Sequence, residues 1–332
     1  MSKLLHNLLS DLLPYLKDDS VSDISINQPG EAWLDNGIIS QRVDIKKLSL
    51  AHCQALARQI ATHSEQSVSE EDPLLSAHLP TGERIQIVMC PATWWLDEDN
   101  TPSPTLAISI RKLKATSLVL NQYAKNGGFS RIGDQNQHEQ KVGHHLKEFQ
   151  NKGEYSALLQ YAVKNHQTIL ISGATYSGKT SFLNMLLKEI PLHERLITIE
   201  DVPELHVPHP NRVRLFYSRG GQGRALIQAG DLVLATLRMR PDRIILGELR
   251  GDDAVHWLTA ANSGHPGTLA TIHADEPTMA LEKLTLMVMA HHTSLGRDEV
   301  YRYVTSIVDI VVQLKRDHQG LRYVSDILLT KK

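Results

Sequence analysis

The chain has 332 residues, enough for two or three domains that each bury a core. Hydrophobic residues make up 41% and charged residues 22%, the composition of an ordinary soluble globular protein. The 35 basic and 37 acidic residues nearly cancel, so the total charge does not indicate a nucleic-acid-binding protein. Cys53 and Cys90 form neither a CxxC pair nor a disulfide framework, which fits a reducing compartment.

The N-terminal segment MSKLLHNLLSDLLPYL predicts an amphipathic helix rather than a targeting or spanning segment. Its leucines recur at a four-residue step and form one apolar stripe, which we expect to pack on its own domain. An interfacial membrane helix is the alternative, but it would need more cations than Lys3 and Lys17 provide. No stretch approaches the ~18 apolar residues of a spanning helix. We therefore expect a cytoplasmic protein, at most peripherally associated with a membrane.

Residues 1–113 carry short strand and turn signals and predict a small α+β domain. Turns are expected at Pro29-Gly30, at 35–37 and at Thr81-Gly82, and the strand signal TLAISIRKL ends near Arg111. Residues 114–153 are rich in Asn, Gln, Gly and charge, and predict a linker with at most a short helix.

Residues 154–332 alternate between strand, turn and helix signals. Short apolar runs at 168–171, 196–199, 243–247 and 267–272 lie between helical patterns, which predicts an α/β domain with a largely parallel sheet. A final pair of runs around RDHQG predicts a terminal hairpin.

Each of the four apolar runs ends in a polar or reactive group. The first runs into a glycine-rich loop, the second into Glu200 and Asp201, the third into Glu248 and the fourth into His273. Ligands of open α/β sheets bind at the carboxyl ends of the strands, so the sequence predicts one shared site there.

The glycine-rich loop GATYSGKT fits the phosphate-binding pattern GxxxxGK[ST] between a strand and an amphipathic helix. Backbone N–H groups of such a loop surround the phosphates of a nucleotide. Lys179 is expected to reach the β- and γ-phosphates, and the Thr180 hydroxyl to bind Mg²⁺. The loop residues that we expect to bind ATP are Gly173, Ala174, Thr175, Tyr176, Ser177, Gly178, Lys179, Thr180 and Ser181.

Three further positions are candidate catalytic residues. Glu248 follows RIIL, where it can polarise the attacking water or hold Mg²⁺ through a water. Glu200 is a second acid for metal or water, although Asp201 or Glu204 could serve instead. His273 can sense the γ-phosphate, and a structural histidine is an equal alternative.

Five segments together resemble the type II/type IV secretion traffic ATPases: GATYSGKTSFLNMLLKEIP, ERLITIEDVPEL, PHPNRVRL, LRMRPDRIILGELRG and SGHPGTLATIHAD. The subgroup that the chain resembles most is the soluble hexameric ATPase of type IV secretion and conjugation systems, because VSDISINQPGEAWLD and LPTGERIQIVMC also look like its N-terminal domain. The likeness covers most of the chain apart from the linker and the extreme termini.

The resemblance implies a RecA-like C-terminal domain with residues 173–180 as Walker A, preceded by the smaller α+β domain. It puts Glu200, Asp201 and Glu204 in an aspartate box, Glu248 at the Walker-B glutamate, and His265 and His273 in a histidine box. It also implies that Arg84 and Arg111 reach the γ-phosphate from the N-terminal domain. Arg238 and Arg240 are further candidates for phosphate or intersubunit contacts, and surface ion pairing is the alternative for all four arginines.

The function implied by the resemblance is a homohexamer that couples hydrolysis of ATP with Mg²⁺ to substrate transfer or pilus assembly. Its expected partners are other secretion components at the inner membrane (a coupling protein and a second ATPase) and, transiently, the secreted protein or DNA, without stable sequence-specific nucleic-acid binding. A type II secretion or pilus motor is an alternative, although two cysteines cannot supply the four-cysteine zinc module common there. A RecA-like helicase and a non-hydrolysing scaffold are further alternatives.

The loop departs from the family at Tyr176, where most members have glycine. If this position has a positive φ, a tyrosine there costs roughly 1–2 kcal/mol. We expect its ring to project out of the phosphate cradle.

Overall fold

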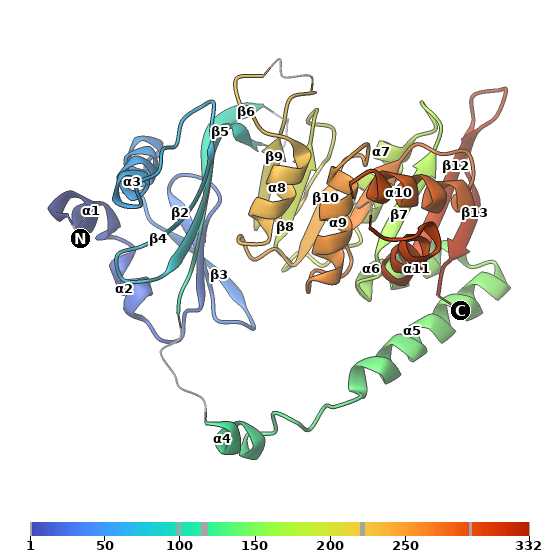
Figure 1. Cartoon of the computed structure of the whole chain (residues 1–332), viewed down its shortest axis with the longest axis horizontal. Helices are drawn as coiled ribbons and strands as arrows, with labels where there is room; N and C mark the ends of the chain where they lie inside the picture. Colours follow the sequence, from blue (N-terminus) through green and yellow to red (C-terminus); the bar gives the residue numbers. More distant parts are fainter. Residues whose placement is uncertain (1, 98–100, 114–118, 220–222, 292–293, 332) are drawn as a thin grey trace.

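The computed structural model describes residues 2–97, 101–113, 119–219, 223–291 and 294–331, which form two domains joined by one continuous sheet (Figure 1). The N-terminal domain comprises α1 (Lys3–Leu9), α2 (Leu13–Lys17), β1 (Asp23–Ile26), β2 (Glu31–Asp35), β3 (Ser40–Asp44), α3 (Leu50–His63), β4 (Leu74–His78), β5 (Arg84–Leu96) and β6 (Pro102–Arg111). All the strand pairs within it are antiparallel.

The C-terminal domain alternates strands and helices, as the sequence predicts. Its elements are α6 (Tyr155–Lys164), β7 (Ile169–Gly173), α7 (Lys179–Leu187), β8 (Leu196–Glu200), β9 (Arg212–Phe216), α8 (Ala229–Thr236), β10 (Arg243–Leu246), α9 (Asp253–Asn262), β11 (Leu269–Ile272), α10 (Pro277–His291), α11 (Arg297–Ile307), β12 (Ile310–Arg316) and β13 (Arg322–Leu329). Strands β12, β7, β11, β10, β8 and β9 are parallel neighbours, and β13 adds the predicted hairpin. The expected fold class is therefore confirmed.

The parallel strands are buried on both faces. Along β7, Ile169 and Ile171 pack into a core with α6 and α7, whereas Leu170 belongs to the core formed with α8 to α11 on the opposite face. Helices thus cover both faces of the sheet, and only its edges and strand ends remain for binding.

The leucine-rich N-terminus packs on its own domain, as expected, but it forms two short helices instead of one. Leu5, Leu9, Leu12 and Leu16 are buried in the N-terminal core. The break has a local cause, because Pro14 lies in the first turn of α2, where its missing N–H and its ring are tolerated, while neither fits a helix interior.

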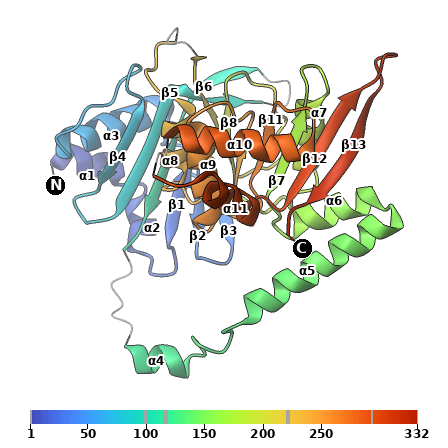
Figure 2. The same cartoon turned by 45° about the vertical axis from the view of Figure 1, so that its right-hand side comes forward.

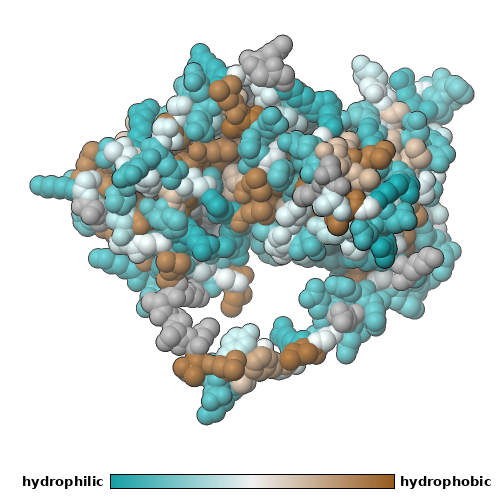
Figure 3. Space-filling view, in the orientation of Figure 1, coloured by the Kyte–Doolittle hydropathy of each residue, from teal (hydrophilic) through white to brown (hydrophobic). Residues whose placement is uncertain are grey.

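The predicted linker contains more helix than expected: α4 (Leu120–Lys125) and the 19-residue α5 (Asp134–Lys152). Val142 and Leu146 of α5 are buried in the C-terminal core, whereas α4 buries no side chain. In Figures 1 and 2, α4 stands away from both domains, and Figure 3 shows apolar side chains gathered along its segment. The domain boundaries at 113 and 154 stay a prediction. In the described part of the chain, no helix combines the length and the apolar character needed to cross a bilayer.

The domains are joined by the pairing of β5 with β9 through Thr93 and Leu215, and also by a buried polar cluster around Arg195. The Arg195 guanidinium donates to Asn27 Oδ1 at 2.6 Å and to Met239 O at 3.1 Å, and it also contacts Ser109 Oγ at 3.5 Å. Asn27 and Ser109 belong to the N-terminal domain. Complete burial lowers the pKa of Arg195 to about 10, and the group stays charged at neutral pH.

We predict that Arg195→Met lowers the midpoint of thermal unfolding by about 5–10 °C, because it leaves several buried acceptors without donors at a cost of about 3 kcal/mol. Differential scanning calorimetry of the full chain measures this midpoint. Arg58→Met, at an exposed position of α3, is the control and should change it by less than about 2 °C. An Arg195→Met midpoint equal to that of the control would show that the cluster does not stabilise the domain contact.

Candidate nucleotide-binding site

A cleft of about 410 Å³ lies at the carboxyl ends of β7, β8, β10 and β11. All four strand ends that the sequence singled out contribute to it. Its lining residues are Thr175, Tyr176, Gly178, Lys179, Thr180, Ser181, Glu200, Asp201, Val202, Glu204, Leu205, Gly247, Glu248, Arg250, Thr271, His273 and Arg322.

The loop between β7 and α7 has the compact turn that a phosphate cradle requires. A Cβ at Gly173 would lie 2.4 Å from Ser177 Oγ and 2.8 Å from Leu314 O, so only glycine fits there. Gly178 has a φ of +94° and caps the N-terminus of α7, which places backbone N–H groups at the cleft. Tyr176 has a φ of +62°, and its side chain is 76% exposed. The condition stated for Tyr176, a positive φ, is therefore met, and the exposure of the residue agrees with a ring that projects outward.

Lys179 is buried in the mouth of the cleft and is held by the loop itself. Its Nζ donates to Gly173 O at 2.9 Å and Ala174 O at 3.0 Å, and it lies 3.2 Å from His273 Nδ1. Burial lowers the pKa of Lys179, and the Lys283 charge adds to this, while Glu248 opposes it. The ammonium is therefore poorly solvated and well placed to bind an anion.

His273 links Lys179 to Glu248. Because an ammonium only donates hydrogen bonds, Nδ1 accepts, and we assign the ring proton to Nε2. His273 Nε2 lies 3.0 Å from Glu248 Oε1, close enough for an electrostatic contact although the alignment is not that of a hydrogen bond. Burial lowers the pKa of His273, as do the Lys179 and Lys283 charges, which favours the neutral ring.

Glu248 keeps an unused acceptor in the cleft. Its Oε1 is buried without a hydrogen bond, whereas Oε2 is paired with Arg250. Burial raises the pKa of Glu248 above the usual range for a glutamate, and Lys179 and Arg219 oppose the shift. A desolvated carboxylate with a free oxygen is a suitable acceptor for a proton of water.

The side chain of Glu200 lines the cleft but is already bound by the protein. Its carboxylate accepts hydrogen bonds from Arg214 Nε at 3.0 Å and from Arg214 Nη2 at 2.9 Å, which together form a buried bidentate salt bridge. Thr198 Oγ1 and the Leu205 N–H also donate to it, at 2.8 and 2.9 Å. These four bonds use both carboxylate oxygens, which argues against the expected role of Glu200 as a metal ligand or catalytic acid.

Mg²⁺ fits the remaining donors of the cleft. It keeps several waters and takes few protein ligands, usually one or two carboxylates in addition to phosphate oxygens. Thr180 lines the cleft, and Glu248 Oε1 is an orphaned acceptor. Asp201 is a further carboxylate there, held 3.1 Å from Arg219.

The structure does not bring four other expected residues to the cleft. Arg84 and Arg111 face each other across β5 and β6, and Arg111 Nε lies 2.8 Å from Asp23 Oδ1. Arg240 pairs with Asp35 at 2.9 Å. His265 does not line the cleft either. The sheet joins the domains edge to edge at β5 and β9, and neither Arg84 nor Arg111 is among the residues that line the cleft.

Sequence reasoning missed four cations in or beside the cleft. Arg250 and Arg322 line it, Arg219 pairs with Asp201, and Lys283 Nζ donates to His273 O at 2.8 Å. Arg250 stands two residues after Glu248, a spacing that could have drawn attention. Arg322 lies outside every motif of the sequence. It reaches the cleft only through the folding of the terminal hairpin.

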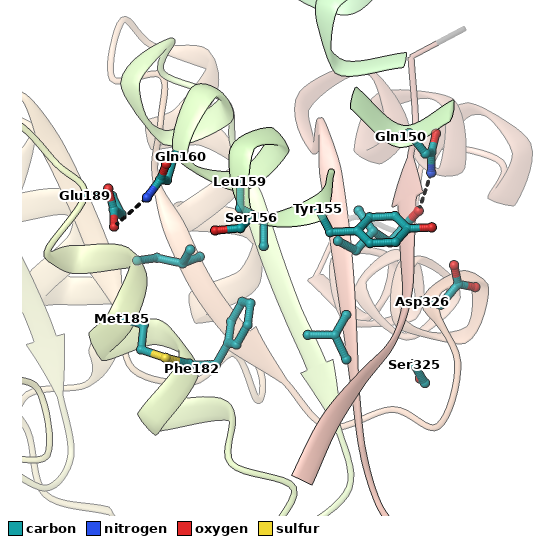
Figure 4. Close-up of a pocket in the computed structure, with 13 residues that line it drawn as sticks. Gln150, Tyr155, Ser156, Leu159, Gln160, Phe182, Met185, Glu189, Ser325 and Asp326 are labelled. Atoms are coloured by element: carbon teal, nitrogen blue, oxygen red, sulfur yellow. Dashed lines mark hydrogen bonds between the residues drawn. The ribbon is translucent and has the colours of Figure 1, made fainter. Parts of the chain in front are cut away.

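A second cavity, of about 490 Å³, lies between α6, α7 and β13 (Figure 4). Phe182 and Met185 of α7 form one side, and the carboxylates Glu189 and Asp326 are among its lining residues. No lysine or arginine lines it in the described part of the chain. It is therefore unsuited to polyphosphate, in contrast to the cleft at the loop, which Lys179, Arg250 and Arg322 line.

The family described as "Type II/IV secretion system protein" matches residues 4–319. The chain therefore belongs to this family of secretion ATPases, which confirms the resemblance drawn from its motifs.

Curated relatives narrow the comparison to type IV secretion. The chain is 37% identical to the type IV secretion system protein VirB11 of Bartonella quintana, over 93% of this chain and 88% of the relative. It is 38% identical to the type IV secretion system protein PtlH of Bordetella pertussis, over 95% and 91%. A crystal structure of the VirB11 ATPase from the Brucella suis type IV secretion system, in complex with sulphate, superposes with a TM-score of 0.90 at 34% identity, over 98% of this chain and 94% of that one.

We predict that Glu200→Gln lowers the midpoint of thermal unfolding by about 5 °C or more, because the buried Arg214 charge loses its counter-charge. Asp201→Asn is the matched control: its ion pair is partly exposed, and the midpoint should hardly change. Scanning calorimetry is measured on both variants, and Mg²⁺-dependent ATP hydrolysis is compared between Glu200→Gln and the wild type. A Glu200→Gln variant with normal stability but without Mg²⁺ dependence would restore Glu200 as a metal ligand.

For Tyr176 we predict that Tyr176→Gly unfolds about 2–4 °C above Tyr176→Ala, because both remove the ring but only glycine relieves about 1 kcal/mol of backbone strain. Since the loop already has its turn, neither variant should change ADP affinity more than about threefold. Calorimetry of unfolding and of ADP binding measures both quantities. Equal stability of the two variants would show that the positive φ is not strained.

Proposed function

We propose that the chain is the ATP-hydrolysing motor of a type IV secretion system and works as a homohexamer. The observation that carries the proposal is the series of contacts from Lys179 through His273 to Glu248, which joins the phosphate loop to a partly desolvated carboxylate within one cleft. The names of the relatives support type IV secretion as the setting.

Lys179 binds the phosphates by exchanging partners. Its ammonium makes contacts with two loop carbonyls and His273 Nδ1, all neutral acceptors. Phosphate oxygens carry full negative charge and form stronger bonds to an ammonium than neutral acceptors do. The exchange releases His273 Nδ1, so the arrival of the phosphates is transmitted to the histidine.

Glu248 orients the attacking water through its free oxygen, and its raised pKa suits it to accept a proton. His273 holds the position of this carboxylate through Nε2. Thr180 and either Glu248 or Asp201 would hold Mg²⁺, which would supply charge that neutralises the phosphate oxygens.

The assembly and its location are part of the same proposal. We infer a cytoplasmic hexamer attached peripherally to the inner membrane, where it contacts the other ATPase and coupling components and, transiently, the exported protein or DNA. Arg84 and Arg111 stay predicted contacts to the γ-phosphate, and Arg238 and Arg240 stay predicted contacts to phosphate or to a neighbouring subunit.

We predict that Glu248→Gln binds ATP within about threefold of the wild-type affinity but hydrolyses it at least about 100-fold more slowly, because an amide cannot accept the proton. Phosphate release and calorimetric ATP binding are measured together on the full chain. Lys179→Ala is the contrasting variant and should weaken ATP binding itself. Loss of ATP binding in Glu248→Gln would contradict its role on water.

Wild-type hydrolysis should fall as the pH drops through the raised pKa of Glu248, because the carboxylate becomes protonated above the usual range of a glutamate.

A further inference from the structure

We propose that Arg322, on the terminal hairpin, binds the α- and β-phosphates of the nucleotide. This inference rests on the proposed function and adds a ligand from outside the phosphate loop and the Walker motifs.

The register of the sheet brings the hairpin to the phosphate loop. β12 runs parallel to β7, and its last pair with that strand joins Leu314 to Gly173, where the loop begins. The hairpin continues past this point through Arg316, turns, and returns with Arg322 at the start of β13. Figures 1 and 2 both show this end of the hairpin extending beyond the sheet. Arg322 is therefore held beside the loop by regular strand pairing.

The stem of Arg322 packs directly on the loop. A Cβ at Gly178 would lie 3.0 Å from Arg322 Cδ, and Arg322 lines the same cleft as Lys179 and Thr180. Backbone groups of this part of a phosphate loop surround the α- and β-phosphates. Glu248 and His273, which act on the γ end in the proposed mechanism, come from other strands. The contact with Gly178 thus assigns Arg322 to the phosphates that are not transferred.

The charge of Arg322 has no structural use that competes with this role. Among the described residues, no ion pair involves Arg322, and its cross-strand neighbour is another cation, Arg316. Like charges directly opposite on paired strands are unfavourable. Arg316 instead folds over the turn, where a Cβ at Gly320 would lie 3.2 Å from its Nη2. An exposed cation held beside a phosphate cradle matches an anionic ligand.

The second cavity shows that the hairpin is anchored on its other side. Gln150 Nε2 of α5 donates to Ile327 O of β13 at 2.9 Å, drawn as a dashed line in Figure 4. β13 is thereby tied to α5 as well as to β12. Arg322 is carried by a fixed strand rather than a free loop, which favours its use as a ligand.

The test is calorimetric titration of the full chain with ADP and with a non-hydrolysable ATP analogue, in the presence of Mg²⁺. Arg322→Ala should weaken both by the same factor, about 10- to 100-fold, as expected for the loss of a charge-assisted bond to phosphate. Arg322→Lys should keep part of the affinity. Arg316→Ala, the cross-strand arginine outside the cleft, is the matched control and should bind as the wild type does.

The outcomes distinguish a failure of the Arg322 assignment from a failure of the proposed function. Unchanged affinity of Arg322→Ala for ADP, with normal binding by the wild type, would overturn the assignment of Arg322 alone. A loss confined to the ATP analogue would overturn it too, because it would place Arg322 at the γ-phosphate. Failure of the wild type to bind either nucleotide would overturn the proposed function and this inference with it. The thermal midpoint of each variant without nucleotide shows that its fold is intact.

Discussion

The buried ammonium of Lys179 is the interaction on which the rest of the site depends. A lysine at this depth must be surrounded by acceptors, and the loop meets the requirement with the carbonyls of Gly173 and Ala174. The loop can present them only because Gly173 tolerates the close approach of Ser177 and Gly178 takes a positive φ. The third acceptor, His273, comes from another strand and brings Glu248 with it. The geometry of the loop thus influences the position of the Glu248 carboxylate, for which we propose the catalytic role.

A further series of contacts connects this cleft to the N-terminal domain. Thr93 Oγ1 of β5 donates to Arg214 O at 2.9 Å, and the Arg214 guanidinium holds the Glu200 carboxylate at the floor of the cleft. Each contact is buried, so none is weakened by solvent screening. A displacement of β5 against β9 would therefore reach Glu200 directly. These contacts connect the N-terminal domain to the lining of the cleft without involving its arginines.

Most of the C-terminal fold could be predicted, because buried parallel strands have short apolar runs in their sequence. Each of these runs is also followed by a polar group. The same logic brought the loop, Glu248 and His273 together. Glu200 could not be resolved this way, since its partner Arg214 lies on β9, a strand that the sequence analysis had not identified. Arg322 was out of reach for a related reason: its place depends on the register of β12 against β7, and no local pattern encodes a register.

The N-terminal half was harder to predict. Turn residues marked its strands well, but a leucine stripe alone did not reveal that Pro14 divides the first helix. The polar composition of residues 114–153 gave no sign of the α5 helix. This helix contributes only a few apolar side chains to the C-terminal core, namely Val142, Leu146 and Phe149. The positions of Arg84 and Arg111 depend on how the two domains dock, which is a tertiary property of the β5–β9 contact.

The central claim is that phosphate replaces the protein acceptors of Lys179 and so frees His273. A crystal structure of the chain with ADP and Mg²⁺ tests it most directly. The account predicts Lys179 Nζ within hydrogen-bonding distance of a β-phosphate oxygen and withdrawn from His273 Nδ1. ADP bound in the cleft with the contact between Lys179 and His273 unchanged would contradict it.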